Sequence, residues 1–292
     1  MKIQLLSDLH IEHFETYDHF QNKYKKLHGH NLCEKVYGEV LVLAGDIGNA
    51  FQSSYFEFLN DVSKKYSHVM IVAGNHEFYS NEYWSCNQQM IKVCSQFNNV
   101  HFLDRASIEL TSNSGEKILF LGCALWSQVP DNAKTMVQKC MNDYHLINIK
   151  DDNNSNMRTL TVDDTNYFFN RDYNFLKDAI EKERNTPVTQ QRKIIVVTHH
   201  APMTTGVSSP YYENTQDTET LLINSAFASD LRHLMGSPVV LWISGHTHYS
   251  AIQQHNGTHI ASNQLGYISF QSDDNDNHYR EDLFFDTLQN SQ

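Results

Sequence analysis

The chain has 292 residues, 40% hydrophobic and 12% aromatic, which is enough to bury a sizeable core in one large domain or two small ones. It carries 22 basic and 34 acidic residues, a formal net charge of −12, which disfavours duplex nucleic acid and anionic membranes as partners. No apolar run approaches the roughly 18 residues of a membrane span, and no signal-peptide pattern opens the chain. The five cysteines lack C-x-x-C spacing, so we expect a soluble cytoplasmic protein.

Short apolar, β-branched runs alternate with longer segments of helical period. The runs predict buried strands of four to six residues at Ile3–Leu6, Val40–Ala44, Val69–Ala73, Ile194–Thr198 and Val239–Ser244. Weaker patterns predict strands at Val100–Leu103 and Ile118–Trp126, and helices at Phe51–Tyr66, Asn81–Phe97 and Thr161–Lys182. The alternation indicates a layered α/β protein, and periodicity alone predicts a single open sheet.

No internal repeat or change in composition marks a domain boundary. We therefore expect residues 1–292 to form a single domain, with 271–292 as a peripheral C-terminal segment. Asn/Asp-rich loops are predicted at Asp151–Met157 and Ser272–His278, and a long linker at Met203–Leu222.

Each of the five buried runs is followed closely by a polar cluster. The clusters are Asp8-Leu9-His10, Gly45-Asp46, Gly74-Asn75-His76-Glu77, His199-His200 and Gly245-His246-Thr247-His248. In open α/β sheets, ligands bind outside the carboxyl ends of the strands, where loops converge. A lone Asp or His at such a place is more often a turn or capping residue. Five coincidences, in a chain with 17 histidines, favour a functional site.

The clusters have the chemistry of a metal site. Residues i and i+2 of an extended segment point to the same side, so Asp8 with His10, and His246 with His248, can each serve one site. Carboxylate, amide and imidazole donors suit manganese, iron, zinc, nickel or cobalt better than calcium. The donors are too many for one four-coordinate zinc and suit two ions with a bridge: Asp8, His10, Asp46, Asn75, His199, His246 and His248. The positive charge of two divalent ions exceeds the negative charge of two carboxylates, so the centre would attract an anion such as a phosphate ester.

In order and kind, the five clusters resemble the D-x-H, G-D, G-N-H-[DE], H and G-H-x-H motifs of calcineurin-like metallophosphoesterases, and they extend from residue 8 to residue 248. The resemblance implies an α/β fold, an αββα sandwich of two mixed β-sheets flanked by helices. It implies two divalent or trivalent ions of manganese, iron, zinc or nickel. One would be held by Asp8, His10, Asp46 and His248, and the other by Asp46, Asn75, His199 and His246.

The same resemblance implies a phosphoric ester hydrolase. Such an enzyme would cleave a phosphomonoester or phosphodiester by attack of metal-bound hydroxide, on a small substrate such as a nucleotide. His76 matches the family's non-ligand histidine, which would protonate the leaving group or stabilise transition-state charge. The alternative is a non-catalytic metal-binding or interaction scaffold of the same fold. Scaffolds of this kind usually have gaps in the ligand set, and this chain has none.

The second motif departs from that of the protein serine/threonine phosphatases, which continues as G-D-x-x-D-R-G. Asn49 and Ala50 stand where those enzymes have the later Asp and the Arg, which disfavours a phosphoprotein substrate. Asn49 would hydrogen-bond His76 but would not raise its pKa as a carboxylate does. The segments Val196–Pro202 and Trp242–His248 are similar to those of small bacterial phosphoesterases.

Candidate substrate contacts lie beside these motifs. Family members with a similar segment place the ligand at the first of two histidines, so His200 would line the substrate side or support a neighbour. Asn263, after the last motif, and Tyr211, in the 203–222 segment, are further candidates. Each could equally be an ordinary loop or packing residue.

Overall fold

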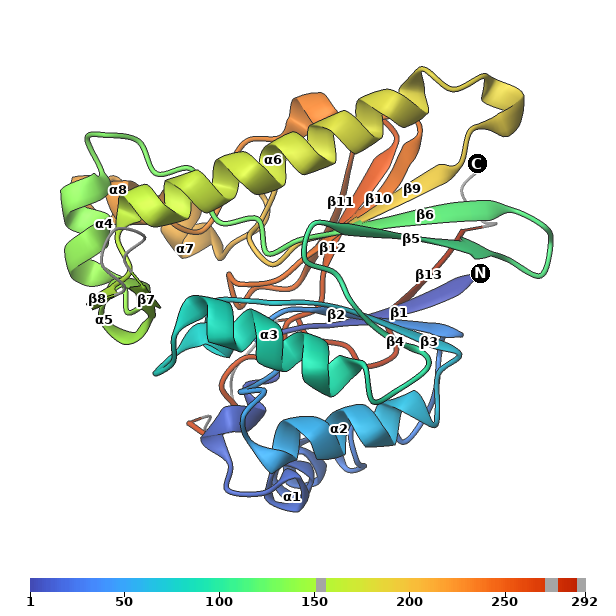
Figure 1. Ribbon diagram of the computed structural model, residues 1–292, viewed down its shortest axis with the longest axis horizontal. Coiled ribbons are helices and arrows are strands. Elements are labelled where there is room, and N and C mark those ends of the chain that lie inside the picture. The colour runs from blue at the N-terminus through green and yellow to red at the C-terminus, as the bar shows by residue number, and fades with distance from the viewer. Residues whose placement is uncertain (151–155, 271–277, 288–292) are drawn as a thin grey trace.

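The computed structural model describes residues 1–150, 156–270 and 278–287. Two large sheets face each other between helices (Figure 1). The five-stranded sheet contains, in spatial order, β13 (Phe284–Asp286), β1 (Lys2–Leu6), β2 (Val40–Ala44), β3 (His68–Val72) and β4 (Val100–Phe102). The six-stranded sheet contains, in spatial order, β11 (Ala251–His255), β12 (Thr258–Ser262), β10 (Val239–Ser244), β9 (Lys193–Val197), β6 (Lys117–Gly122) and β5 (Ala106–Thr111).

Both sheets are mixed. In the first, β1 to β4 are parallel neighbours and β13 is antiparallel to β1. In the second, β12, β10, β9 and β6 are parallel, with β11 and β5 antiparallel at the edges. The two-sheet arrangement is confirmed. The single open sheet is wrong, because apolar runs identify buried strands but carry no information on how the strands divide between sheets.

The core has two parts because the central strands are buried on both faces. Ile3, Leu5 and Ile243 belong to the cluster between the sheets, whereas Leu41 and Leu43 belong to a cluster that packs with the helices. Alternate residues of a strand point to opposite faces, so a strand covered on both sides is apolar throughout. For this reason the central strands are visible in the sequence as continuous runs.

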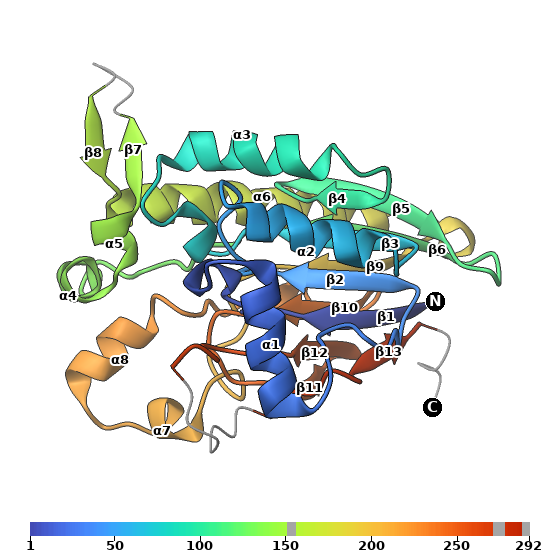
Figure 2. The same ribbon diagram turned by 90° about the horizontal axis from the view of Figure 1, so that it is seen from below.

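Helices cover the outer faces. Helix α6 (Val162–Arg184) lies along the outside of the six-stranded sheet, and α1 (Tyr17–His28), α2 (Ser53–Ser63) and α3 (Tyr83–Cys94) lie on the side of the other sheet (Figures 1 and 2). The three predicted helices correspond to α2, α3 and α6, whereas α1 was not predicted. Short 3-10 helices occur at Ile11–His13, His76–Phe78, Val188–Gln190 and Arg232–Leu234.

Two excursions depart from the layers at one end of the sandwich. The first contains α4 (Lys134–Cys140), α5 (Asp143–Leu146) and the hairpin of β7 (Asn148–Lys150) and β8 (Met157–Thr159). The second contains α7 (Pro210–Glu213) and α8 (Thr218–Asn224). The segment 203–222 is therefore not a plain linker. Capping by Ser209 and Asp217 begins these two helices, which are too short to show a helical period in the sequence.

The described part of the segment 271–292 reaches back to the start of the chain. Lys2 of β1 pairs with Asp286 of β13, and the N–H of Thr287 donates to Met1 O at 3.0 Å. Residues 151–155, 271–277 and 288–292 lie outside the described residues, and with them most of the loops predicted at 151–157 and 272–278. No helix in the described ranges combines the length and apolarity needed to cross a bilayer.

Candidate active site

The polar clusters follow strands that end at one edge of the sandwich. Five of their non-glycine residues have positive φ angles: Asp8 (54°), His10 (50°), Asp46 (53°), His246 (74°) and His248 (51°). This left-handed conformation is costly for residues other than glycine, and it is concentrated at functional sites. It turns the chain sharply after β1, β2 and β10, so that side chains from these strand ends face a common centre.

The structure brings the predicted metal ligands into two groups. Ligand atoms of Asp8, His10, Asp46 and His248 lie within 4.8 Å of one another, and so do those of Asp46, His199 and His246. Asn75 joins the second group, because its Oδ1 is 3.1 Å from His199 Nε2. Asp46 belongs to both groups, and six of the seven side chains are buried, with His248 partly exposed.

Hydrogen bonds behind the rings direct free nitrogen atoms into these groups. His199 Nδ1 donates to the carbonyl of Ala44 at 2.9 Å, so Nε2 faces Asp46 Oδ2 at 3.4 Å. His10 Nδ1 contacts Glu12 at 3.1 Å, so its Nε2 faces His248 Nε2 at 3.0 Å. His246 Nε2 is buried and has no hydrogen-bond partner among the described residues. Acceptors that converge in this way fit a cation, and the N/O donor set fits transition-metal ions.

Without a cation, protonation balances part of this cluster. Burial disfavours the charged form of His199, but the carboxylates of Asp46 and Asp8 and the Ala44 carbonyl together outweigh burial and raise the pKa of His199 to about 10. For His248, burial and the neighbouring His10 ring lower the pKa to about 3, which keeps its ring neutral. Because metal binding requires unprotonated nitrogens, an ion that binds here would displace the proton from His199.

Asp143 fixes the amide of Asn75. The Asp143 carboxylate accepts hydrogen bonds from Asn75 Nδ2 at 2.8 Å and from the Tyr79 hydroxyl at 2.7 Å. Asn75 Oδ1 therefore points toward His199. Asp143 begins α5, 68 positions from Asn75 in the chain, and no pattern in the sequence connects the two residues.

Glu77 fastens two strand-end turns together. Its buried carboxylate accepts hydrogen bonds from the backbone N–H groups of Asp46 (3.0 Å), Ile47 (2.7 Å) and Gly74 (2.6 Å). The turn after β2 is thereby held against the turn after β3. The acidic residue of the G-N-H-E motif thus positions Asp46, a role that the motif alone does not reveal.

His76 lies at the edge of the two groups and is held from both sides. Its Nδ1 is 3.0 Å from Glu12 Oε1, and its Nε2 is 2.9 Å from the Tyr267 hydroxyl. Burial opposes protonation of His76, but the carboxylates of Asp46 and Glu12 outweigh it and raise its pKa to about 9. The same contacts with His10 and His76 lower the pKa of Glu12 to about 2, against the effect of burial.

Glu12 and not Asn49 contacts the His76 ring. Asn49 Oδ1 instead accepts a hydrogen bond from the N–H of Phe51 at 2.9 Å, in the turn before α2. Glu12 is not among the predicted site residues, because its contact with His76 spans 64 positions. His13 is likewise not among them, although it belongs to a further group of possible ligands with His10, Glu12 and His76.

The three candidate substrate contacts lie apart from the centre of the site. His200 is buried and packs on His246, with ring centroids 4.1 Å apart, and it does not line the cavity beside the site. Both polar atoms of the Asn263 side chain bond backbone groups, Nδ2 the carbonyls of Leu5 and Arg280 and Oδ1 the N–H of Arg280. Tyr211 is 78% exposed and does not line the adjacent cavity, whereas its neighbour Tyr212 does.

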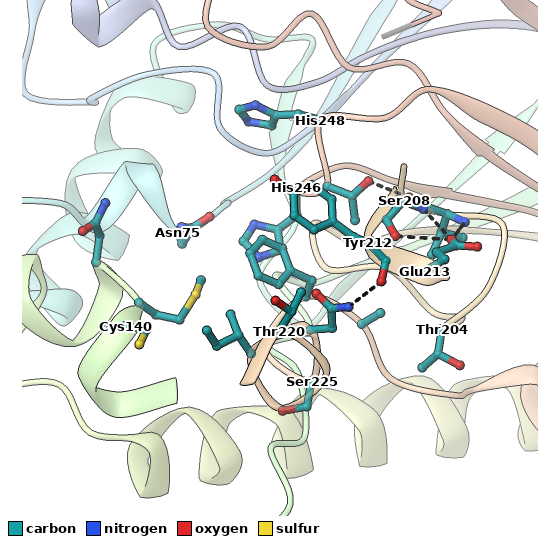
Figure 3. A pocket seen from close by; sticks show the side chains of 18 of the residues that line it. Asn75, Cys140, Thr204, Ser208, Tyr212, Glu213, Thr220, Ser225, His246 and His248 are labelled. Carbon is teal, nitrogen blue, oxygen red and sulfur yellow. Dashed lines mark hydrogen bonds between the residues drawn. The ribbon is translucent and has the colours of Figure 1, made fainter. Parts of the chain in front are cut away.

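A cavity of about 800 Å³ adjoins the two groups (Figure 3). At one end lie Asn75, His76, His246 and His248, and at the other the residues of α7, α8 and the loops around them. The site thus combines a buried cluster of metal-ligand atoms with an open space beside it.

Comparisons with known proteins agree with this geometry. A profile of the calcineurin-like phosphoesterase family matches residues 1–250. An uncharacterized protein of Acanthamoeba polyphaga mimivirus is 32% identical over 276 residues, which are 91% of each chain. The crystal structure of a phosphopantetheinyl hydrolase from Mycobacterium tuberculosis is similar in fold, with a TM-score of 0.61 and 14% identity over 92% of this chain and 90% of that one. The chain belongs to the calcineurin-like phosphoesterase family, whose members are metal-dependent hydrolases of phosphorylated substrates.

Proposed function

We propose that the chain is a dinuclear metallohydrolase that cleaves a small phosphomonoester or phosphodiester. The supporting observation is the convergence of two ligand groups on Asp46, with the ligand atoms of each group within 4.8 Å of one another. A single four-coordinate ion would leave several of these buried donors unused, whereas two ions with a shared carboxylate use them all.

One ion would be held by Asp8, His10, Asp46 and His248, and the other by Asp46, Asn75, His199 and His246. When bound, the ions would supply an activated water and would neutralise the charge of the phosphate group. The chain's own contribution is orientation. Asp143 turns the Asn75 oxygen inward, and the Ala44 carbonyl fixes the His199 ring.

His76 is the proposed proton donor. Its ring is held by Glu12 at Nδ1, and its Nε2 contacts Tyr267 at the edge of the cavity. A protonated ring in this place would donate to the leaving oxygen or stabilise charge on the phosphoryl oxygens. Tyr267 would hold the Nε2 proton in position until the substrate replaces this contact.

The test is hydrolysis of 4-nitrophenyl phosphate and bis(4-nitrophenyl) phosphate after reconstitution with manganese, iron, zinc or nickel. We expect about two ions per chain and metal-dependent turnover. His76→Ala should lower kcat by about 10²–10⁴ while both ions remain, because it removes a proton donor and no ligand. His19→Ala, at an exposed position, is the matched control and should retain full activity.

Two outcomes would overturn the proposal. Metal content below about one ion per chain after reconstitution would favour the non-catalytic scaffold. Absence of turnover by the fully metallated protein, on these esters and on a panel of nucleotides and other phosphoesters, would exclude the enzyme. Loss of metal in His76→Ala would show instead that His76 is structural.

A further inference from the structure

The cavity beside the candidate site is much larger than a phosphate group. Its volume of about 800 Å³ falls within the range of about 300–1,000 Å³ that pockets for drug-sized molecules occupy. Because the metal-ligand groups lie at one end, the remaining space is available to the organic part of an ester (Figure 3).

The lining outside the metal-ligand groups is largely apolar. Leu221, Ile223 and Phe227 line the cavity from the second excursion, and Met141 lines it from the first. The Phe227 ring stacks on His246, with centroids 4.8 Å apart and an interplanar angle of 28°. The apolar wall is therefore continuous with the metal-ligand cluster. Uncharged polar side chains, including Thr204, Thr220 and Asn224, complete the lining.

Few charged side chains line the cavity. Among the described residues that line the cavity there is no lysine and no arginine. Apart from Asp46, which belongs to the metal-ligand groups, the one carboxylate is Glu213. Anionic groups in protein pockets are normally matched by Arg, Lys or a metal ion, and an unmatched anion loses its hydration without compensation. Beyond the metal-ligand groups and His76, this cavity offers a negative charge to its occupant and no positive one.

Glu213 is fixed in place. Its carboxylate accepts hydrogen bonds from the N–H groups of Gly206, Val207 and Ser208, each at 2.8 Å. The Thr247 hydroxyl donates to the Val207 carbonyl at 2.6 Å, which ties this loop to the G-H-T-H motif. The wall is thus preformed and keeps a constant position relative to the site, so its shape and charge can select a substrate.

We propose that the cavity selects phosphoesters whose organic group is uncharged and partly apolar, and discriminates against those that carry a second anionic group. The inference rests on the proposed function, since the phosphate must occupy the metal end for the organic group to reach the apolar wall. A second anion at that wall would approach Glu213 with no cation to compensate.

Matched aryl esters test the selectivity. Phenyl phosphate and 4-sulfophenyl phosphate, and the corresponding diaryl diesters, differ only in a sulfonate. We expect kcat/KM to be at least tenfold higher for the unsulfonated member of the pair that is hydrolysed. The intrinsic reactivity of the two esters predicts the opposite, a faster reaction of the sulfonated ester, because the sulfonated phenol is the better leaving group. Equal values, or higher values for the sulfonated ester, would overturn the inference.

A charge introduced at the wall gives a second test. Leu221 lines the cavity and is 50% exposed, so Leu221→Lys should fold and should supply the missing cation. We expect it to raise kcat/KM for the sulfonated ester at least fivefold relative to the unsulfonated one. Gln216→Lys adds the same charge at an exposed residue outside the lining and should leave the ratio unchanged. If Leu221→Lys and Gln216→Lys changed the ratio of kcat/KM values equally, the lining of the cavity would not be what selects the substrate.

Binding separates this inference from the proposed function. Calorimetric titration of the metallated protein with phenyl phosphate and with 4-sulfophenyl phosphate should give a Kd at least tenfold lower for the former. If neither ester is hydrolysed but this difference is present, the proposed function fails and the selectivity of the cavity stands. If hydrolysis occurs and the two Kd values agree, the selectivity fails alone.

Discussion

Asp46 is the residue on which most contacts of the site converge. Its N–H is held by Glu77, its Oδ1 accepts from the N–H of His76 at 2.9 Å, and its Oδ2 faces His199 at 3.4 Å. Gly74 packs directly against it, since a Cβ at position 74 would overlap Asp46 Oδ1. The glycine of the G-N-H-E motif is therefore required by this close approach and not by a positive φ.

Gly74→Ala should displace the Asp46 carboxylate. We expect fewer than two bound ions per chain by elemental analysis, because Asp46 is the ligand shared by both groups, and a loss of kcat of about 10² or more. Gly48→Ala is the matched control, since a Cβ there meets nothing closer than 3.4 Å. A fully metallated Gly74→Ala protein would contradict this account of the turn.

Glu12 is a positioning residue for two rings at once, His10 and His76. Glu12→Gln keeps an oxygen acceptor and removes the charge, so kcat should fall about tenfold with little change in KM. Glu12→Ala removes both contacts and should also weaken metal binding by about 10–100-fold, the usual effect of losing a carboxylate behind a ligating His. Glu15→Gln, at an exposed position nearby, serves as control. An unchanged kcat in both Glu12 variants would show that the contacts are incidental.

At the scale of elements, the residues at the ends of strands and helices fix where each element begins and stops. Helix α6 begins with a capping box, in which the Thr161 side chain accepts from the N–H of Asp164 and the Asp164 carboxylate accepts from the N–H of Thr161. This helix is the main cover of the six-stranded sheet, so its start affects the stability of the whole layer (Figure 1).

Thr161→Ala should lower the free energy of unfolding by about 1 kcal/mol, since it removes the acceptor for one of the free N–H groups of the first turn. Urea denaturation measures the change. Thr135→Ala, at an exposed position in α4, is the control and should have an effect below about 0.5 kcal/mol. Both variants should keep their metal content, so a loss of metal in Thr161→Ala would contradict the separation of this helix end from the site.

At the scale of the whole molecule, the candidate site connects the two sheets. Asp8, His10, Asp46 and Asn75 follow strands of the five-stranded sheet, whereas His199, His246 and His248 follow strands of the six-stranded sheet. Each proposed ion would take ligands from both sheets. Metal binding should therefore stabilise the sandwich as a unit and not one layer alone.

Removal of metal should lower Tm. A ligand at 100 times its Kd adds about 2.7 kcal/mol, and a chain of this size shifts by about 2–4 °C per kcal/mol, so we expect a decrease of about 5–10 °C on chelation. Re-addition of manganese or zinc should restore the Tm. His246→Ala, which removes a ligand of one ion, should reduce the shift. A Tm independent of metal would contradict the connection between the sheets.

The sequence predicts the parts of this fold that depend on local pattern. The five central strands are visible because they are apolar on both faces, and the clusters Asp8 to His10 and His246 to His248 are visible because they follow directly. Contacts between residues that are far apart in the chain cannot be predicted from one sequence. The division of the strands between two sheets, the contact of Asp143 with Asn75, and the cavity wall of α7 and α8 all depend on packing between distant segments.

The pairing of β13 with β1 has a consequence for how the protein is made. Strand β1 is synthesised before the other described strands, yet one of its edges has no partner until residues 284–286 have been synthesised. The ligand set is likewise incomplete until His248 has emerged. Until β13 has been synthesised, the nascent chain therefore exposes an open edge of β1. Such an edge can pair with strands of other chains.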